Sequence, residues 1–358
     1  MEFLVKDAQE TQEQLGNDTD TLIGQATIKV IGCGGAGSNM VNWLYNKGIK
    51  GAEIAAINTD KQHLDIVEAD KKILIGKELT KGLGCGGFPE KGREAAKESI
   101  YELKEWLQGT DMVFITAGMG GGTGTGSAPV VAQLARDMGS IVIGTVTMPF
   151  DIERARVDKA EFGLQQLRDV SDTVIVIDNN RLVNIAGNLP IKQAFAVANE
   201  LVSTMIKGIV EIIAVPSLVN LDYADVKAIM ANGDVSVIGI GESDSEHRVE
   251  EAVKRAMSNP LLDVSYDGAS GALIHVAGGD DLTLDEVSKV GELVTESLDQ
   301  DANVIWGARI SNEMNGKVRV MTIVTGVNSP YILGKADHSR PSAESMKVSS
   351  ELGIDIVR

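Results

Sequence analysis

The amino-acid sequence predicts an α/β protein with two domains: a Rossmann-like parallel sheet covered by helices, followed by a smaller α/β domain. Short apolar stretches of strand length alternate with stretches whose apolar residues recur at helical spacing. One long helical pattern, Ile191–Ile213, separates two such series. The length of 358 residues also suits about two domains, each with its own core.

The first series alternates strands with helices. Its predicted strands are Ile28–Ile31, Glu53–Ile57, Lys72–Ile75, Met112–Thr116, Ile141–Val146 and Thr173–Ile177. Its predicted helices are Asn39–Asn46, Glu90–Leu107, Val130–Met138 and Lys159–Val170. Strands that alternate with helices form a parallel sheet with helices on both faces, so we expect a sheet buried on both sides.

The long pattern predicts one continuous helix of about 34 Å. After it, strands are predicted at Val235–Ile240, Gly271–Val276, Asn303–Ile310 and Val318–Val324, and helices at Glu246–Met257 and Leu284–Leu298. The expected organisation is a polar arm (1–25), a first domain (26–190), a central helix (191–214), a second domain (215–328) and a flexible tail (329–358).

Composition and charge argue against several classes of protein. The net charge of −18 argues against a nucleic-acid-binding surface, which needs a basic stripe. The two cysteines, Cys33 and Cys85, form no metal-ligand cluster, and the histidines show no zinc spacing. No apolar run approaches the roughly 20 residues of a membrane span, and the acidic start does not fit a signal peptide. We expect a cytoplasmic protein that does not insert into membranes.

A glycine-rich run, Met119–Pro129, is the most informative motif of the chain. It follows the apolar strand Met112–Thr116 and precedes the helical pattern Val130–Met138. A glycine-rich bend between a strand and a helix exposes backbone N–H groups that bind phosphate. A flexible linker is the alternative, but linkers do not join a buried strand to an apolar helix. The run therefore predicts a phosphate-binding loop.

A second glycine motif, Gly32–Gly37, follows the first strand and fits the pattern G-x-G-x-x-G. Alone it fits a dinucleotide site and a tight turn equally well. Asn58, Thr59 and Asp60 end the second strand, and the ends of parallel strands line one edge of a sheet, so both glycine loops can reach one ligand. A dehydrogenase needs only one such loop. The P-loop pattern G-x-x-x-x-G-K-[ST] is absent, which excludes an ordinary P-loop NTPase.

Seven blocks in order resemble the tubulin/FtsZ family, and in particular the archaeal and bacterial FtsZ proteins. The resemblance runs from about Ile28 to Val327 and rests on IGCGGAGSN, AINTDKQ, KGLGCGGFPEKG, GMGGGTGTGSAP, TMPFDIE, AFAVANEL and LVNLDYADVKAIM. It implies a self-polymerising cytoskeletal GTPase of cell division, with a GTP-binding first domain and an activating second domain. GTP or GDP, with Mg²⁺, would be its cofactors.

The resemblance also implies a set of nucleotide-binding residues. They are Gly34, Gly35, Ala36, Gly37, Ser38, Asn39, Asn58, Gly120, Gly121, Gly122, Thr123, Gly124, Thr125, Gly126, Pro149, Glu153, Arg156, Asn179, Phe195 and Asn199. Phe195 and Asn199 are four residues apart, so a helix presents them side by side. Without the resemblance, Phe195 would be assigned to the core and Asn199 to the solvated surface.

Three polar residues beyond the long helix, Asn220, Asp222 and Asp225, carry two interpretations. Their spacing fits a helix start, with Asp222 as the N-cap of a helix Asp225–Met230. The resemblance instead implies acids that activate GTP hydrolysis. They would lie about 30 Å from their own nucleotide, at the far end of the long helix. They could then act only on the nucleotide of a neighbour stacked head to tail, and such stacking generates filaments.

Three points stay open. The segment Glu153–Arg156 is one residue shorter than the family pattern Glu-Gly-x-x-Arg, so either Arg154 or Arg156 fills the arginine position. The apolar end, Gly353–Arg358, resembles the short motif with which FtsZ proteins dock on a membrane-tethering adaptor, here a SepF-like partner; the alternatives are a frayed end or a strand added to the second domain. The competing functions are a filament protein for cell shape and an NAD-dependent oxidoreductase.

Overall fold

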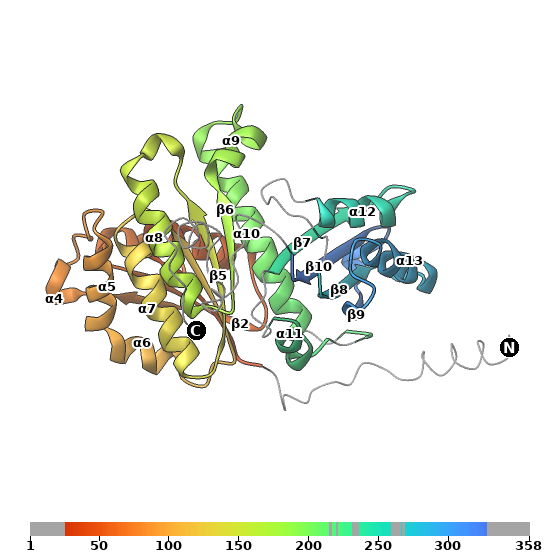
Figure 1. Ribbon diagram of the computed structural model, residues 1–358, viewed down its shortest axis with the longest axis horizontal. Coiled ribbons are helices and arrows are strands. Elements are labelled where there is room, and N and C mark those ends of the chain that lie inside the picture. Colours follow the sequence, from red (N-terminus) through yellow and green to blue (C-terminus); the bar gives the residue numbers. More distant parts are fainter. Residues whose placement is uncertain are drawn as a thin grey trace, which may run out of the picture.

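The computed structural model describes residues 26–214, 217–219, 221–230, 236–258, 266 and 269–327 (Figure 1). Within them, a six-stranded sheet forms the first domain. Its strands are β1 (Ile28–Cys33), β2 (Ala52–Asn58), β3 (Lys71–Leu74), β4 (Met112–Gly118), β5 (Ile141–Met148) and β6 (Thr173–Asp178). Every neighbouring pair is parallel, which confirms the predicted fold class.

The strand order in this sheet is β3-β2-β1-β4-β5-β6. The chain therefore winds outward from β1 in one direction and from β4 in the other. The connection after β1 runs toward β2, and the connection after β4 runs the other way, toward β5. Because they diverge, a crevice opens between β1 and β4 at the carboxyl edge of the sheet. The two glycine motifs follow these two adjacent strands.

Helices cover both faces of the sheet because its strands are apolar on both sides (Figure 1). In β4, Met112 and Phe114 pack toward α2 and α10, while Val113 and Ile115 pack toward the helices on the opposite face. The helices of this domain are α2 (Gly34–Lys47), α3 (Lys61–Ile66), α4 (Lys77–Thr80), α5 (Pro89–Glu98), α6 (Ile100–Leu107), α7 (Thr123–Asp137), η1 (Asp151–Glu153), α8 (Ala155–Val170) and α9 (Asn179–Ala186).

The structure corrects several predicted boundaries. The expected helix Glu90–Leu107 is two helices, α5 and α6, which meet at Ser99. The Ser99 hydroxyl accepts a hydrogen bond from the backbone N–H of Gly76 at 3.2 Å, and such contacts with the backbone compete with helix continuation. The helices expected to begin at Asn39 and Val130 begin earlier, at Gly34 and Thr123, so the glycine motifs supply their first turns. The short helices α3, α4 and α9 were not predicted.

The central helix α10 (Ile191–Ala214) has 24 residues, as its apolar spacing predicts. It joins the first domain to the second, which contains α11 (Tyr223–Met230), β7 (Ser236–Ser243), α12 (Arg248–Met257), β8 (Gly271–Gly278), α13 (Leu284–Thr295), β9 (Asn303–Ile310), η2 (Asn312–Met314) and β10 (Val318–Thr325). One apolar core runs from the first sheet through α10 to β8 and β10.

The second sheet has the order β7-β10-β8-β9, with β10 antiparallel to both neighbours and β8 parallel to β9. All four predicted strands are present, and α13 ends at Thr295, before the predicted Leu298. The polar arm (1–25) and the tail (329–358) lie outside the described residues. Among the residues that the structure describes, no helix is long and apolar enough to cross a membrane. The domain boundaries stay a prediction.

Candidate nucleotide-binding site

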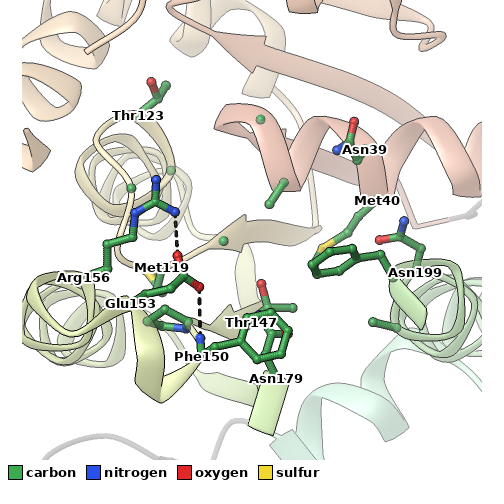
Figure 2. A pocket seen from close by; sticks show the side chains of 18 of the residues that line it. Asn39, Met40, Met119, Thr123, Thr147, Phe150, Glu153, Arg156, Asn179 and Asn199 are labelled. Carbon is green, nitrogen blue, oxygen red and sulfur yellow. Dashed lines mark hydrogen bonds and ion pairs between the residues drawn. The ribbon is translucent and has the colours of Figure 1, made fainter. Parts of the chain in front are cut away.

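A cleft of about 520 Å³ lies at the carboxyl edge of the first sheet, where β1 and β4 end (Figure 2). The residues that line it come from both glycine motifs, from the segments after β5 and β6, and from the start of α10. They are Gly35, Ala36, Asn39, Met40, Gly118, Met119, Gly121, Gly122, Thr123, Gly124, Thr147, Pro149, Phe150, Glu153, Arg156, Asn179, Phe195, Ala198 and Asn199. Segments far apart in the sequence thus meet at one site.

Two helix N-termini open into this cleft. Neither α2 nor α7 has a side-chain N-cap, and neither has an acidic residue in its first turn. The first N–H groups of a helix have no intrahelical acceptor, and here no side chain caps them. The positive ends of both helix dipoles add to this effect. The arrangement therefore favours a ligand with several negative charges, such as a phosphate chain.

The two N-termini approach each other closely because two glycines meet. Gly34 has φ +72°, and a Cβ at this position would lie 2.6 Å from the backbone nitrogen of Gly124. That distance is far below van der Waals contact, so a side chain at Gly34 would push the two helices apart. Gly120, with φ +90°, turns the chain from β4 into the loop in the left-handed region that glycine favours.

Hydroxyl groups hold the glycine-rich loop after β4 to its neighbours. Thr123 and Thr59 share a hydrogen bond of 2.6 Å between their Oγ1 atoms, and Thr59 also contacts the thiol of Cys85 at 3.4 Å. Within α7, the Ser127 hydroxyl donates to the carbonyl of Thr123 at 2.7 Å. Thr123 is therefore fixed from both sides, at the point where the loop becomes a helix.

An ion pair borders the cleft below this loop. Arg156 Nη1 lies 2.7 Å from Glu153 Oε2, and the other carboxylate oxygen of Glu153 accepts the N–H of Phe150 at 3.0 Å (Figure 2). Arg154 does not line the cleft; it caps α8 with φ +38°. Of the two arginines that the sequence left open, the structure brings Arg156 to the cleft.

Amide and aromatic side chains occupy the opposite end. Figure 2 shows Asn39 and Asn199 on one side of the cleft, with Thr123 and Arg156 on the other. The rings of Phe195 and Phe150 form an edge-to-face pair, with centroids 6.1 Å apart and planes at 69°. Phe195 stays 40% exposed, so it is not the core residue that periodicity alone suggests. This end suits a flat heteroaromatic base with donors and acceptors on its rim.

Seven of the residues proposed for the nucleotide do not line the cleft: Gly34, Gly37, Ser38, Asn58, Gly120, Thr125 and Gly126. The glycines among them pack against neighbouring backbone, and Ser38, Asn58 and Thr125 are buried. The Asn58 oxygen accepts the N–H groups of Thr59 and Asp60, which ties this side chain to its own turn. Their contact with a nucleotide stays a prediction.

Six lining residues were not predicted: Met40, Gly118, Met119, Thr147, Phe150 and Ala198. Met119 is the first residue of the glycine-rich run, Gly118 directly precedes it, and Ala198 precedes Asn199, so adjacency to predicted residues was the available signal. Phe150 carried a weaker signal, as an aromatic residue directly after Pro149 at the end of a strand.

The acids beyond α10 lie elsewhere. Asp222 precedes α11 and Asp225 sits in its first turn, and neither lines the cleft. Each carboxylate accepts the backbone N–H of the other residue, at 2.8 and 3.0 Å, as the N-cap interpretation requires. Asn220 lies outside the described residues.

The charge inside the cleft is nearly balanced, because its lining residues include one acid and one base, Glu153 and Arg156, and these pair with each other. Helix ends and backbone amides therefore carry the positive potential. Burial raises the pKa of the Cys33 thiol, at the end of β1, to about 12, so this cysteine stays a neutral thiol. Both cysteines are free and buried. Within the described residues, no group of three or more histidine, cysteine, aspartate or glutamate side chains could hold a metal ion.

Comparison with known proteins decides which family this architecture represents. Residues 27–187 match the model of the Tubulin/FtsZ family GTPase domain, and residues 234–328 match the FtsZ family C-terminal domain. The cell division protein FtsZ 2 of Methanocaldococcus jannaschii is 56% identical over 351 residues, which cover 97% of this chain and 92% of that protein. The chain belongs to the tubulin/FtsZ family. The FtsZ 2 of Haloferax volcanii is 51% identical, with 96% and 88% covered.

Solved structures agree with this assignment. A dimer of FtsZ from M. jannaschii superposes with a TM-score of 0.78 at 51% identity, covering 89% of this chain and 92% of that one. A GTPγS-bound protofilament of CetZ2 from H. volcanii superposes with a TM-score of 0.72 at 22% identity, covering 91% and 98%, and shares the fold. As a member of the family, this protein binds guanine nucleotides and hydrolyses GTP, which decides against the dinucleotide oxidoreductase that G-x-G-x-x-G alone left open.

Proposed function

We propose that this protein assembles head to tail into filaments in cell division and hydrolyses GTP at the junction between two subunits. The observation that carries the proposal is the position of Asp222 and Asp225 relative to the cleft. The acids lie near the edge of the first sheet where β4 begins, and the cleft lies at the opposite edge, where β4 ends. A subunit stacked on the carboxyl edge would bring its own acids to a nucleotide that the acids of the first subunit cannot reach.

The separation follows from one hydrogen bond. Tyr223, at the start of α11, donates its hydroxyl hydrogen to the carbonyl of Asp111 at 2.9 Å. Asp111 directly precedes β4, whereas Gly118, the last residue of β4, lines the cleft. A strand rises about 3.3 Å per residue, so these two ends are about 23 Å apart. Asp222 and Asp225 flank Tyr223 and therefore lie far from the cleft of their own subunit.

Head-to-tail contact between the two edges uses different surfaces on each partner. Such a heterologous interface does not close on itself and continues into a filament. The carboxylates of Asp222 and Asp225, together with Asn220, would orient and polarise the water that attacks the γ-phosphate of the neighbour. Hydrolysis would then depend on assembly. The M. jannaschii FtsZ dimer and the CetZ2 protofilament support self-assembly by the same fold.

The nucleotide contacts follow the two ends of the cleft. The N–H groups of Gly121, Gly122 and Gly124 would hold the β- and γ-phosphates, and Asn199 with Phe195 would hold the guanine. A magnesium ion would supply charge that offsets the phosphates during hydrolysis. The described residues contain no group of three or more acidic, histidine or cysteine side chains that could hold the ion, so phosphate oxygens and water would supply most of its ligands.

Relatives favour a role in division over a role in cell shape. Two that carry the name cell division protein are 56% and 51% identical to this chain, over 97% and 96% of its length. We place the filaments in the cytoplasm at the division site. Depleting the protein in its native cell, and scoring division against shape, separates the two roles.

A membrane adaptor is the proposed partner of the tail. The strong negative charge of the chain opposes direct binding to an anionic membrane, so filaments need a tether there. Gly353–Arg358 would dock on a SepF-like adaptor. Deleting these residues should leave GTP hydrolysis and assembly intact and release filaments from adaptor-bearing vesicles. Loss of assembly in the deletion would show instead that the tail belongs to the fold.

The concentration dependence of activity tests the central proposal. GTP hydrolysis per molecule should rise with protein concentration and then level off as filaments form. A constant activity per molecule, down to concentrations at which the protein is monomeric, would overturn hydrolysis between subunits.

A further inference from the structure

We infer that His63 is a positioning residue for the nucleotide: it fixes the amide of Asn39 so that its NH₂ group faces the cleft as a hydrogen-bond donor. His63 lies on α3, and its backbone N–H is held by the Asp60 carboxylate at 3.1 Å. It does not line the cleft itself. The inference rests on the proposed nucleotide site and adds to it the reason why one of its amides has a defined orientation.

The hydrogen-bond directions among Asn58, His63 and Asn39 can be worked out from backbone N–H groups, which can only donate. The Asn58 side-chain oxygen accepts the N–H of Thr59 at 2.9 Å and that of Asp60 at 3.3 Å. A backbone N–H can only donate, so the other end of the Asn58 amide must be its NH₂ group. That group lies 3.3 Å from Nδ1 of His63. Nδ1 therefore accepts and carries no hydrogen.

A neutral imidazole with an unprotonated Nδ1 carries its hydrogen on Nε2. Nε2 of His63 lies 3.1 Å from Oδ1 of Asn39, so it donates to that oxygen. The oxygen of Asn39 is thereby engaged on the side away from the ligand. Its NH₂ group remains, and Figure 2 shows the nitrogen of Asn39 on the side of the cleft.

This donor matters because Asn39 lies at the end of the cleft that holds Asn199. Without His63, the exposed Asn39 amide could turn by 180° and present its oxygen to the cleft as readily as its NH₂ group. Acceptors of a bound guanine nucleotide would then face an acceptor in part of the population. His63 thus contributes to affinity through Asn39, without contact with the ligand.

A double-mutant cycle tests this coupling. The Kd of GTP is measured at a protein concentration too low for assembly, for His63→Ala, Asn39→Ala and the double variant. His63→Ala should raise the Kd roughly three- to tenfold, the value of one hydrogen bond. Its kcat at saturating GTP, measured separately at a concentration that supports assembly, should be unchanged. In the Asn39→Ala background, His63→Ala should have no further effect. Additive effects of the two changes would overturn the inference.

Two further variants separate positioning from folding. In His63→Gln the side-chain amide NH₂ can replace Nε2–H as the donor to Asn39, so GTP affinity should return to the parental value. Gln62→Ala, on the exposed face of the same helix, is the matched control and should have no effect. An unchanged Kd in His63→Ala, or no rescue by glutamine, would contradict the role of His63. Failure of the site itself has a different signature, since Thr123→Arg would then bind GTP normally.

Discussion

Asp222 and Asp225 hold each other's backbone N–H groups, at 2.8 and 3.0 Å, at the start of α11. This reciprocal contact fully explains why two aspartates stand three residues apart at a helix N-terminus. The same two carboxylates are the acids that we propose for hydrolysis in the neighbouring subunit. A structural and a catalytic role therefore coincide in one pair of residues, and only variants that separate the cap from the charge can tell them apart.

Asp222→Ala and Asp225→Ala should each lower GTP hydrolysis by at least about 100-fold, the usual effect of removing a general base. The Kd of GTP should stay within about twofold, since neither residue lines the cleft. Loss of the cap costs about 1 kcal/mol of stability. Asp222→Asn is the decisive control, because asparagine caps helices as well as aspartate does. It should remain inactive; recovered hydrolysis in Asp222→Asn would assign the pair to capping alone.

Thr123→Arg should abolish GTP binding, measured by calorimetry. The arginine side chain would enter the cleft where α7 begins, and it would also break the 2.6 Å hydrogen bond to Thr59. Thr123→Ser keeps the hydroxyl and should bind nearly as the parent does. Without nucleotide, the melting temperature of Thr123→Ser should match the parent, and that of Thr123→Arg should fall by only about a few degrees, the cost of one hydrogen bond. If Thr123→Arg still bound GTP with the parental affinity, the phosphates would not bind at this loop.

Arg156→Ala should weaken GTP binding about tenfold, because the variant loses a cation at the cleft and leaves Glu153 without its partner. Arg154→Ala should change the Kd by less than about twofold, because Arg154 does not line the cleft. Equilibrium titrations with a fluorescent GTP analogue measure both. The reverse order of effects would show that the shortened segment turns differently when nucleotide binds.

His275 should make stability depend on pH. Burial in β8, with Arg309 and Arg319 nearby, lowers its pKa to about 4. The unfolded chain takes up this proton near pH 6.5 and the folded chain only near pH 4, so the contribution of His275 is constant above pH 6.5 and is lost as pH falls toward 4. The loss amounts to about 3 kcal/mol.

Denaturant titrations of the parent and of His275→Gln between pH 7.5 and 4 test this prediction. Other groups titrate in both proteins, so the difference between the two curves isolates the histidine. The parent should lose stability relative to the variant as pH falls. Parallel curves over this range would show that His275 takes up its proton at an ordinary pKa.

How far the sequence determines the fold is visible in its periodic segments. The short continuous apolar run in β4 and the helical spacing in α10 identified both elements, because each buries a long apolar surface. Short elements such as α3 and α9 were not predicted, since a helix of six or eight residues has too few apolar positions to show a helical period. The break at Ser99 depends on a contact with Gly76, which lies 23 residues away, and no local pattern reports such a contact.

The site was predictable in its motifs and less so in its geometry. Glycine spacing located both loops, but it could not show that both supply first turns of helices or that Gly34 contacts Gly124. Asn58 is a polar residue at the end of a strand, where ligand-binding residues are expected, yet its side-chain oxygen binds the backbone of its own turn. His63 had no signal in the sequence, because its partners Asn39 and Asn58 come from two other elements.

Mixing two inactive variants tests most directly whether the acids act on the neighbouring subunit's nucleotide. Asp225→Ala keeps an intact cleft and lacks an acid, whereas Thr123→Arg keeps both acids and lacks a functional cleft. Each alone should hydrolyse almost no GTP. The mixture should recover hydrolysis, because a junction can pair the cleft of one variant with the acids of the other. Fluorescence energy transfer between labelled variants shows that they assemble together. Co-assembly without any recovery of hydrolysis would contradict catalysis between subunits.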